Sequence, residues 1–346
     1  ARVELRTRSG NALETETVFY NRDNKEITEK QWNRLIPSFR GRVDTSFVVG
    51  GDWSPWSSSY ARSGQGFLSP SPRRYAEIEA RLIAGDRGRA AAGLDWVALD
   101  YSAPLAARVL GEVYPVEVRP GVEEEFTYFV RASQSARGFD RIALESTASL
   151  RFVSAAIENE PVSVEVSVER AGFSARFQRR VRQDELVELR FASEVFVQAT
   201  RFDAFLQDSS MDVAVRQRVE AGDATDQVES STNAVYLSLT EALFVNVDFG
   251  ASCVTPNGDG VNEALEVHFD LVNMLEHRPL SLHVFDAGGR RVRSIEHLAV
   301  AGPHTLAWDG MDEGGRRVPP GIYVVRLRVE GDARAQSASR AVSVTY

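Results

Sequence analysis

Hydrophobic and polar residues alternate with a period of two along much of this chain, which is the pattern of a strand with one buried face. At the start, Val3 and Leu5 alternate with charged residues. The segment RYAEIEARL, residues 74–82, contains good helix formers, yet its apolar positions alternate strictly with charged ones. We therefore predict a strand there and an architecture made mostly of strands.

The segment EITEKQWNRLI is one of the few with a helical pattern. Thr28 is followed three residues later by Gln31, the spacing of a capping box at a helix start. Trp32 and the Leu-Ile pair after Arg34 then fall on one helical face, and Pro37 ends the run. A helix is expected between the cap and the proline.

The middle of the chain reads as a series of short strands. Valine and aromatic positions alternate around a Pro120-Gly121 turn, and VSVEVSVERAGFSARFQRRV is a hairpin about Ala171-Gly172. Six to eight strands over about 130 residues, separated by turn signals, are typical of an immunoglobulin-like sandwich.

The alternation restarts near residue 249. Four residues are expected on one face of the next strand: Leu265, Val267, Phe269 and Leu271. A hairpin with the turn Asp286–Gly289 follows, and three more strands complete the segment. The predicted fold is all-β, with tandem β-sandwich domains at residues 1–112, 113–248 and 249–346.

Length and charge narrow the class of protein. A chain of 346 residues is too long for one ordinary sandwich. The formal charge of −9 argues against a nucleic-acid partner, which requires basic patches. No apolar stretch approaches the roughly 20 residues that span a bilayer, so no transmembrane segment is expected. The first residues lack the layout of a secretion signal, which fits a cytosolic chain or an exported chain whose signal has been removed.

Cys253 is the single cysteine, so an intrachain disulfide is excluded. Its neighbours, GASCVTP, are typical of an inter-domain linker, and no histidine lies near it in sequence. A buried or linker thiol is expected in preference to a nucleophile.

Three ordered motifs in the last segment carry a family resemblance: TPNGDGVNE, VFDAGGRRVRSI and HTLAWDGMDEGGRRVPPGIYVVRL. The segment resembles the FlgD-type immunoglobulin-like domain at the C-terminus of secreted bacterial proteins, and it is similar to gliding-motility-associated C-terminal domains. Glu263 departs from the aspartate that is more usual. The resemblance implies an exported bacterial surface protein.

The first segment is similar, more loosely, to discoidin-like sandwiches, on the strength of VELRTRSGN, DWSPWSSSY, SPSPRRYAEIEARL and a closing strand DWVALDYS. Such sandwiches have earlier strands, and residue 1 already lies in a later one. The chain is then the C-terminal part of a longer polypeptide, or a neighbouring subunit supplies the missing strands at an open edge.

The loop TPNGDGVNE has two interpretations. Oxygen donors at alternate positions make Asn257, Asp259, Asn262 and Glu263 candidate calcium ligands. Alternatively, the side chains of Asn257 and Asp259 accept hydrogen bonds from local amides, with Gly258 and Gly260 at positive φ. The second interpretation is favoured, because a strand follows where a calcium-binding EF-hand continues as a helix.

Aromatic residues in GDWSPWSSSY are candidates for glycan or partner contact: Trp53, Trp56 and Tyr60. Exposed tryptophans stack on sugar rings in many binding modules. Because Trp53 and Trp56 lie three apart, an extended strand would project them differently, and at least one is expected in the core. Packing is the favoured role.

No catalytic constellation is evident. All five histidines lie in the last segment without the spacing of a zinc site: His268, His277, His283, His297 and His304. Nothing resembles a nucleophile elbow or a metalloprotease helix. No cofactor is expected apart from the calcium alternative.

The sequence therefore indicates a non-enzymatic, extracellular bacterial structural or adhesive protein that self-assembles into a surface filament or layer through β-edge contacts. Its expected partners are further copies of itself or other surface proteins, with glycans as an alternative. Two other hypotheses remain: an accessory region of a larger secreted hydrolase, and a carbohydrate-binding module.

Overall fold

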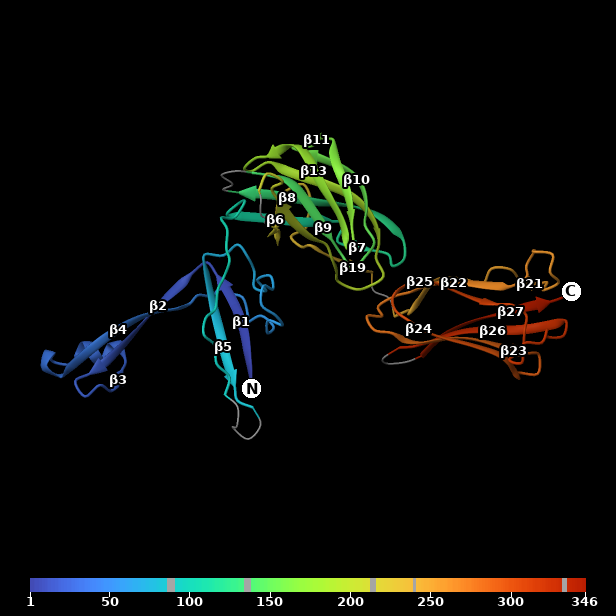
Figure 1. Ribbon diagram of the computed structural model, residues 1–346, viewed down its shortest axis with the longest axis horizontal. Helices are drawn as coiled ribbons and strands as arrows, with labels where there is room; N and C mark the ends of the chain where they lie inside the picture. The colour runs from blue at the N-terminus through green and yellow to red at the C-terminus, as the bar shows by residue number, and fades with distance from the viewer. Residues whose placement is uncertain (86–90, 134–137, 212–215, 239–240, 332–334) are drawn as a thin grey trace. The chain divides into compact units, whose positions relative to one another are not determined.

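The computed structural model describes residues 1–85, 91–133, 138–211, 216–238, 241–331 and 335–346. Within these ranges the protein is almost entirely β-structure (Figure 1), which confirms the predicted all-β class of tandem sandwiches. The chain divides into two compact units, residues 1–104 and 105–346. None of the described helices is long and apolar enough to cross a membrane.

The first unit contains two small sheets. One is an antiparallel pair, which runs in register from Arg2–Ile83 to Gly10–Tyr75. The other has the strand order β3-β2-β4. The strands are β1 (Arg2–Gly10), β2 (Leu13–Asn21), β3 (Glu26–Ile27), β4 (Arg40–Val49) and β5 (Tyr75–Ile83). The predicted strand at residues 74–82 is confirmed as β5.

The predicted helix forms but is shorter than expected. Helix α1 (Glu29–Arg34) begins with the capping box, because Thr28 accepts from the Gln31 amide while the Gln31 side chain accepts from the Thr28 amide. Leu35 is already extended, and the residue before Pro37 is restricted to extended backbone. The helix therefore ends at Arg34, and the 3-10 helix η1 (Pro37–Phe39) follows.

The second unit begins with a sandwich of two large sheets and a small third one. Their strand orders are β11-β10-β14-β8-β6-β18, β12-β13-β9-β16-β17 and β15-β19-β7. The strands are β6 (Arg108–Tyr114), β7 (Glu117–Val118), β8 (Glu123–Ser133), β9 (Phe139–Glu145), β10 (Arg151–Ile157), β11 (Glu160–Pro161), β12 (Val164–Glu169), β13 (Gly172–Val181), β14 (Leu186–Glu194), β15 (Thr200–Arg201), β16 (Asp203–Gln207), β17 (Gln217–Arg218), β18 (Glu220–Ala221) and β19 (Ala234–Leu237).

Aromatic side chains fill the middle of this sandwich. The ring centroids of Phe126 and Phe191 are 5.5 Å apart, and Phe202 lies 5.0 Å from Phe191. All three side chains are fully buried. The ring of Phe173 on β13 lies 6.3 Å from that of Phe191 on β14. Such clusters bury large apolar areas and add specific ring–ring attraction, and this contact joins the two large sheets.

The last part of the unit is a second sandwich with its own core. Its sheets have the orders β20-β22-β25 and β21-β27-β26-β23-β24. The strands are β20 (Phe244–Asp248), β21 (Cys253–Val254), β22 (Leu265–Leu271), β23 (Arg278–Asp286), β24 (Arg291–Ala299), β25 (Gly302–Trp308), β26 (Gly321–Glu330) and β27 (Ala335–Val344). The four residues expected on one face of β22 are all buried. Trp308 lies fully buried in this core.

The same turn closes two loops of this sandwich, in the sequences DAGGRR and DEGGRR. Asp286 Oδ1 accepts from the amides of Gly288 and Arg290, each at 3.0 Å. Asp312 Oδ1 accepts from Gly314 at 2.8 Å and Arg316 at 3.0 Å. In each turn the arginine amide contributes most to lowering the pKa of the aspartate. The aspartates therefore hold both turns as carboxylates.

Two expectations about the chain between strands are wrong. Residues 91–104 contain no strand, so the closing strand DWVALDYS does not form. Cys253 does not lie in a free linker, because β21 pairs in parallel with the end of β27. Its thiol is half-buried and free.

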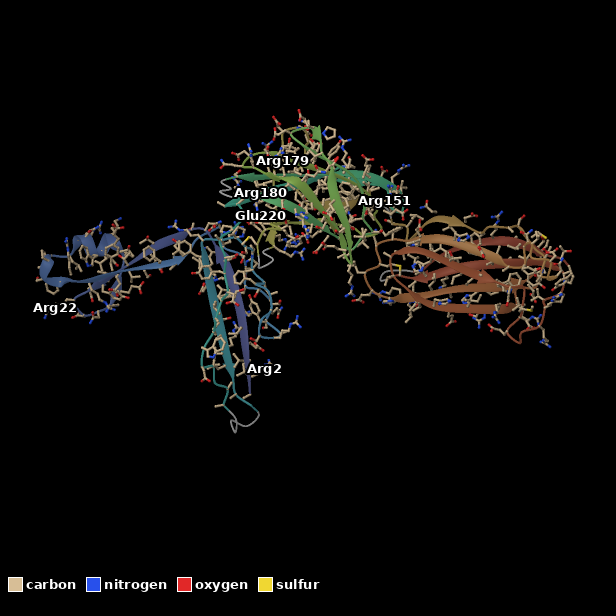
Figure 2. The ribbon with its side chains drawn as sticks, turned by 45° about the horizontal axis from the view of Figure 1, so that its top comes forward. Arg2, Arg22, Arg151, Arg179, Arg180 and Glu220 are labelled. Carbon is tan, nitrogen blue, oxygen red and sulfur yellow. The ribbon has the colours of Figure 1, made fainter. Side chains whose placement is uncertain are left out.

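A buried carboxylate ties β13 to the loop after β16. Asp208 has a side chain only 2% exposed and binds Arg180 through two hydrogen bonds, at 2.6 and 3.0 Å. Its Oδ1 also accepts from the Ser210 amide at 2.9 Å. Hydrogen bonding from Arg180, labelled in Figure 2, holds the pKa of Asp208 well below its usual range.

We expect Asp208→Asn to destabilise the second unit by about 1–3 kcal/mol at neutral pH, since it weakens charge-assisted hydrogen bonds. A depressed folded-state pKa contributes stability above the unfolded-state pKa, about 4, and this contribution is lost as the pH falls through the folded-state value. Urea unfolding at several pH values should therefore show the parent–variant gap shrinking in acid. Asp226→Asn, at an exposed position, is the control. A gap independent of pH would contradict this account.

Candidate functional site

The loop before β22 is held by its own side chains. Asn257 Oδ1 accepts from the Asp259 amide at 2.9 Å, and Asp259 Oδ1 accepts from the Val261 amide at 2.8 Å. Glu263 Oε1 accepts from the amides of Gly258 at 2.6 Å and Gly260 at 3.0 Å. These bonds are possible because both glycines have positive φ, at 90° and 82°.

In this geometry the side-chain oxygens that could bind a cation already accept hydrogen bonds from the loop. The Asn257 side-chain amide also donates to Asp259 Oδ2 at 3.1 Å, which places an N–H donor between two candidate ligands. Asn262 lies in the left-handed region at φ 52°, and its carbonyl accepts from the Thr255 amide. Within the described ranges, no group of three or more His, Cys, Asp or Glu residues is placed to hold a metal. Calcium binding stays a prediction, and the hydrogen bonds support the structural interpretation.

The tryptophans of the first unit stack with arginines of β1. The Arg8 guanidinium lies 4.6 Å from the Trp56 ring centroid and 5.7 Å from that of Trp53. Arg6 lies 5.6 Å from Trp56. Both arginines are also paired with carboxylates on β5, Arg8 with Glu77 at 2.6 Å between Nε and Oε2, and Arg6 with a second glutamate. The guanidinium groups are therefore fixed between rings and carboxylates.

Residues 53–60 run along the free edge of β1 without forming a strand. Three amides of this segment donate to every second carbonyl of β1: Ser54 to Ser9 at 2.9 Å, Ser57 to Thr7 at 2.8 Å and Tyr60 to Leu5 at 2.9 Å. Because the contacts recur every third residue, Trp53 and Trp56 both reach Arg8. The expectation that the two project differently, with one in the core, is wrong; both are half-buried.

Tyr60 is joined to β1 through its hydroxyl group. The hydroxyl lies 2.9 Å from Thr7 Oγ1 and accepts from the Leu68 amide at 3.1 Å. All three predicted aromatic residues thus make contacts within their own unit, with Tyr60 bonded to Thr7 and the two tryptophans stacked on Arg8 of the opposite face of β1. Binding of a glycan there stays a prediction.

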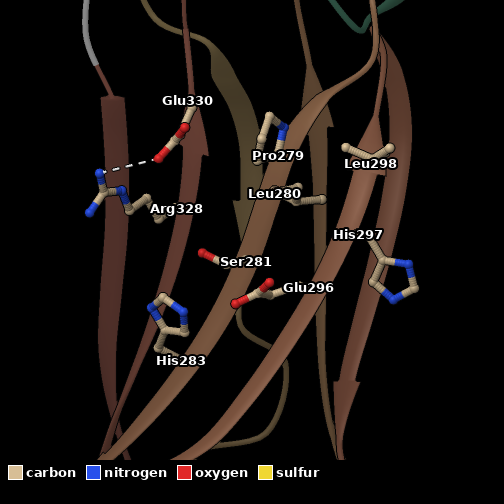
Figure 3. A pocket seen from close by; sticks show the side chains of 9 residues that line it. All are labelled: Pro279, Leu280, Ser281, His283, Glu296, His297, Leu298, Arg328 and Glu330. Carbon is tan, nitrogen blue, oxygen red and sulfur yellow. Dashed lines mark ion pairs between the residues drawn. The ribbon is translucent and has the colours of Figure 1, made fainter.

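A shallow groove of about 500 Å³ lies on the outer face of the last sandwich, over β23, β24 and β26 (Figure 3). Its polar lining consists of Ser281, His283, Glu296, His297, Arg328 and Glu330. Arg328 and Glu330 form an ion pair at 3.5 Å. Burial, followed by nearby Arg291, lowers the pKa of His283. Sequence patterns did not indicate this groove, because its residues come from three strands that only the sheet brings together.

For its length, the first unit exposes more large hydrophobic side chains than the second: among the described residues, twelve lie in residues 1–104 and eleven in residues 105–346. No hydrophobic side chain among its described residues is buried, whereas the second unit contains two large buried clusters and a small third one. Its exposed large hydrophobic residues are Ile36, Phe39, Val43, Phe47, Leu68, Ile78, Leu82, Leu94, Trp96, Val97, Leu99 and Tyr101. Trp96 is 75% and Tyr101 is 92% exposed. Four of the twelve lie close together in sequence in residues 94–99, and exposed apolar residues that gather in one place mark contact sites. The apolar residues of DWVALDYS are the sequence signal for this surface, although the resemblance predicts a closing strand there.

Residues 275–332 match the model of the FlgD Ig-like domain. This match confirms the predicted FlgD-type immunoglobulin-like segment near the C-terminus. No curated protein sequence matches the chain.

Solved structures give weaker likenesses. Dimeric latent PorU from Porphyromonas gingivalis is 12% identical, with 99% of this chain and 30% of that one covered and a TM-score of 0.27. The adhesin InvE of Yersinia pseudotuberculosis is 9% identical over 69% of this chain and 58% of that one, with a TM-score of 0.24. The major pilin SpaD of Corynebacterium diphtheriae is 8% identical over 96% and 82%, with a TM-score of 0.25. The chain thus spans 30% of the length of PorU. At these TM-scores the likenesses carry no argument about function.

Removing the Glu263 carboxylate should destabilise the loop before β22, and calcium should have no effect on this loss. We expect Glu263→Ala to lower the free energy of unfolding by about 1–2 kcal/mol, because two amides lose their acceptor. Glu266→Ala, at an exposed position on β22, should change little. Calorimetry with millimolar calcium should give no heat with the parent. A calcium-dependent rise in melting temperature that Glu263→Ala abolishes would instead establish a metal site.

For the tryptophan patch we expect Trp56→Ala to destabilise the first unit by about 1–2 kcal/mol, through lost ring burial and lost cation–π contact. Faster amide exchange in β1 would report this loss. Trp96→Ala, at an exposed ring, is the matched control and should leave exchange unchanged. If the parent binds a glycan array and Trp56→Ala removes that binding without changing exchange, the patch is a sugar site.

Proposed function

We propose that this chain is a non-enzymatic structural or adhesive element of the bacterial exterior, which acts by binding other protein surfaces. The immunoglobulin-like match and the absence of a predicted catalytic constellation in the sequence support this class. In the proposal, the two closed sandwiches of residues 105–346 are stable modules, and the first unit supplies the contact surface. Export and a surface location belong to the same proposal.

The observation that carries the proposal is the contrast between the units. Burial of apolar surface contributes roughly 25 cal/mol per Å², and the second unit obtains this contribution from its two cores. The first unit leaves twelve large hydrophobic side chains exposed and buries none of those described. Association with another surface would recover that free energy.

Residues 91–104 are the most suitable part of this surface. They pair with no strand in the part of the chain that the structure describes, and Trp96 and Tyr101 are both exposed. Large aromatic side chains are the commonest anchors of protein interfaces because each buries a large area with few rotatable bonds. The segment therefore has the composition of an interface.

The same surface also supports a second candidate function, as an accessory region of a larger secreted hydrolase. In that case the apolar side chains of the first unit pack against another domain of the same polypeptide. The two candidate functions predict different behaviour of the purified chain. A structural or adhesive element forms intermolecular assemblies that grow with concentration, whereas an accessory region of a hydrolase does not.

We expect the purified chain to associate with increasing concentration, by light scattering and electron microscopy. Replacing both Trp96 and Tyr101 with lysine should reduce the assemblies to dimers or smaller species, since lysine cannot be buried without a partner charge. Ile322→Lys, at a 64% exposed position on β26, is the control and should assemble as the parent does. A parent that stays monomeric at high concentration, with a hydrolase domain in its open reading frame, would overturn the proposed function.

A further inference from the structure

The edges of the first sandwich of the second unit are unequal. Its two large sheets end in β11, β17, β18 and β12. Three of these strands are two residues long, whereas β12 has six residues. Short edge strands give a neighbouring chain little backbone to pair with. Strand β12 is therefore the one long edge among the described strands of these two sheets.

Strand β12 carries exposed valines at this edge. Its sequence is VEVSVE, with Val166 38% and Val168 89% exposed. Opposite them on β13 are buried residues, Ala175 and Phe173. The valines thus lie on the core-facing side of the sheet but beyond the margin of the core. An added strand would cover them.

The backbone groups of these valines point outward. The β12–β13 hairpin has a two-residue loop, so its closing pair, Glu169 and Gly172, is hydrogen-bonded. Inward and outward groups alternate along a strand, which directs the amides and carbonyls of Val164, Val166 and Val168 away from β13.

These features select one antiparallel register for two copies of β12. Pairing about Val166 places Val166 opposite its counterpart, Val164 opposite Val168, and Glu165 opposite Ser167. Every outward backbone group then meets another outward group. Shifting the centre by one residue in either direction places glutamates opposite each other, Glu165 opposite Glu165 or Glu165 opposite Glu169. Like charges directly opposite are destabilising, so the sequence favours the register centred on Val166.

We propose that β12 is a self-association edge, at which β12 of a second copy of this chain pairs antiparallel. The two-fold axis passes between the two opposed Val166 residues. This inference rests on the proposed function and extends it, because it adds a contact in the second unit to the contact surface proposed for the first. The two five-stranded sheets become one continuous sheet. A pairing of six-residue strands is smaller than a standard interface, so the dimer is weak and depends on concentration.

The register is tested by cysteine cross-linking in a full chain that carries Cys253→Ala. In the proposed dimer, Val166→Cys forms an intermolecular disulfide under mild oxidation, because opposed residues of a hydrogen-bonded pair are about 5.5 Å apart between Cα atoms, within disulfide range. Val168→Cys is the matched control. Its counterpart lies four residues along the strands, roughly 13 Å away, and this variant should not cross-link. Efficient linking of Val168→Cys but not Val166→Cys would overturn the register.

A substitution tests the association itself. Val168→Lys should raise the dimer dissociation constant by about tenfold or more, because burial of the valine in the dimer is lost. The melting temperature of the protein should not fall, since Val168 is exposed in the single chain. Ile322→Lys should leave the constant unchanged. A parent that associates but is insensitive to Val168→Lys and does not cross-link through Val166→Cys overturns the β12 edge and leaves the proposed function intact. A parent that is monomeric at every concentration overturns both.

Discussion

Packing of alternating apolar side chains between two facing sheets is the interaction on which this protein depends. In the second unit this packing is complete, around the buried rings of Phe126 and Phe191 in one sandwich and around Trp308 in the other. There it holds the facing sheets together. Where it is incomplete, in residues 1–104, strands of the same pattern expose their apolar faces. The difference between the two units is thus a difference in whether a second sheet covers the first, and the proposed function follows from it.

Outside the hydrophobic cores, charged side chains order the turns and loops through hydrogen bonds. The aspartates of the DAGGRR and DEGGRR turns accept amide hydrogen bonds at the same relative positions. Glu263 does the same for the loop before β22. In the first unit, arginines of β1 lie between tryptophan rings and β5 carboxylates. In each case a charged group is used to order backbone or rings, which explains why motifs that look chemical in the sequence make structural contacts here.

Some edge strands are covered by a neighbouring segment, and others are not. Residues 53–60 cover the edge of β1, and Glu313 occupies part of the edge of β24 by donating its amide to the Val292 carbonyl. Strand β12 has neither protection. Its glutamates oppose each other in the registers centred on Glu165 and Ser167, but not in the register centred on Val166, which pairs residues 164–168. Such an edge is selective, because it rejects partners out of register while accepting one of matching sequence.

Most strands, the turns and the immunoglobulin-like C-terminal segment could be predicted from the sequence, because period-two alternation and glycine-containing turns are local properties of the chain. The capping box of Thr28 and Gln31 was equally local. Which apolar faces are covered could not be predicted, because this depends on the tertiary structure. Among the described residues DWVALDYS forms no strand, and Trp53 and Trp56 meet one arginine because the segment between them is not a strand. The tertiary structure also decided that β12 is an edge. Burial and edge position depend on which distant segment lies alongside, and no local pattern contains that information.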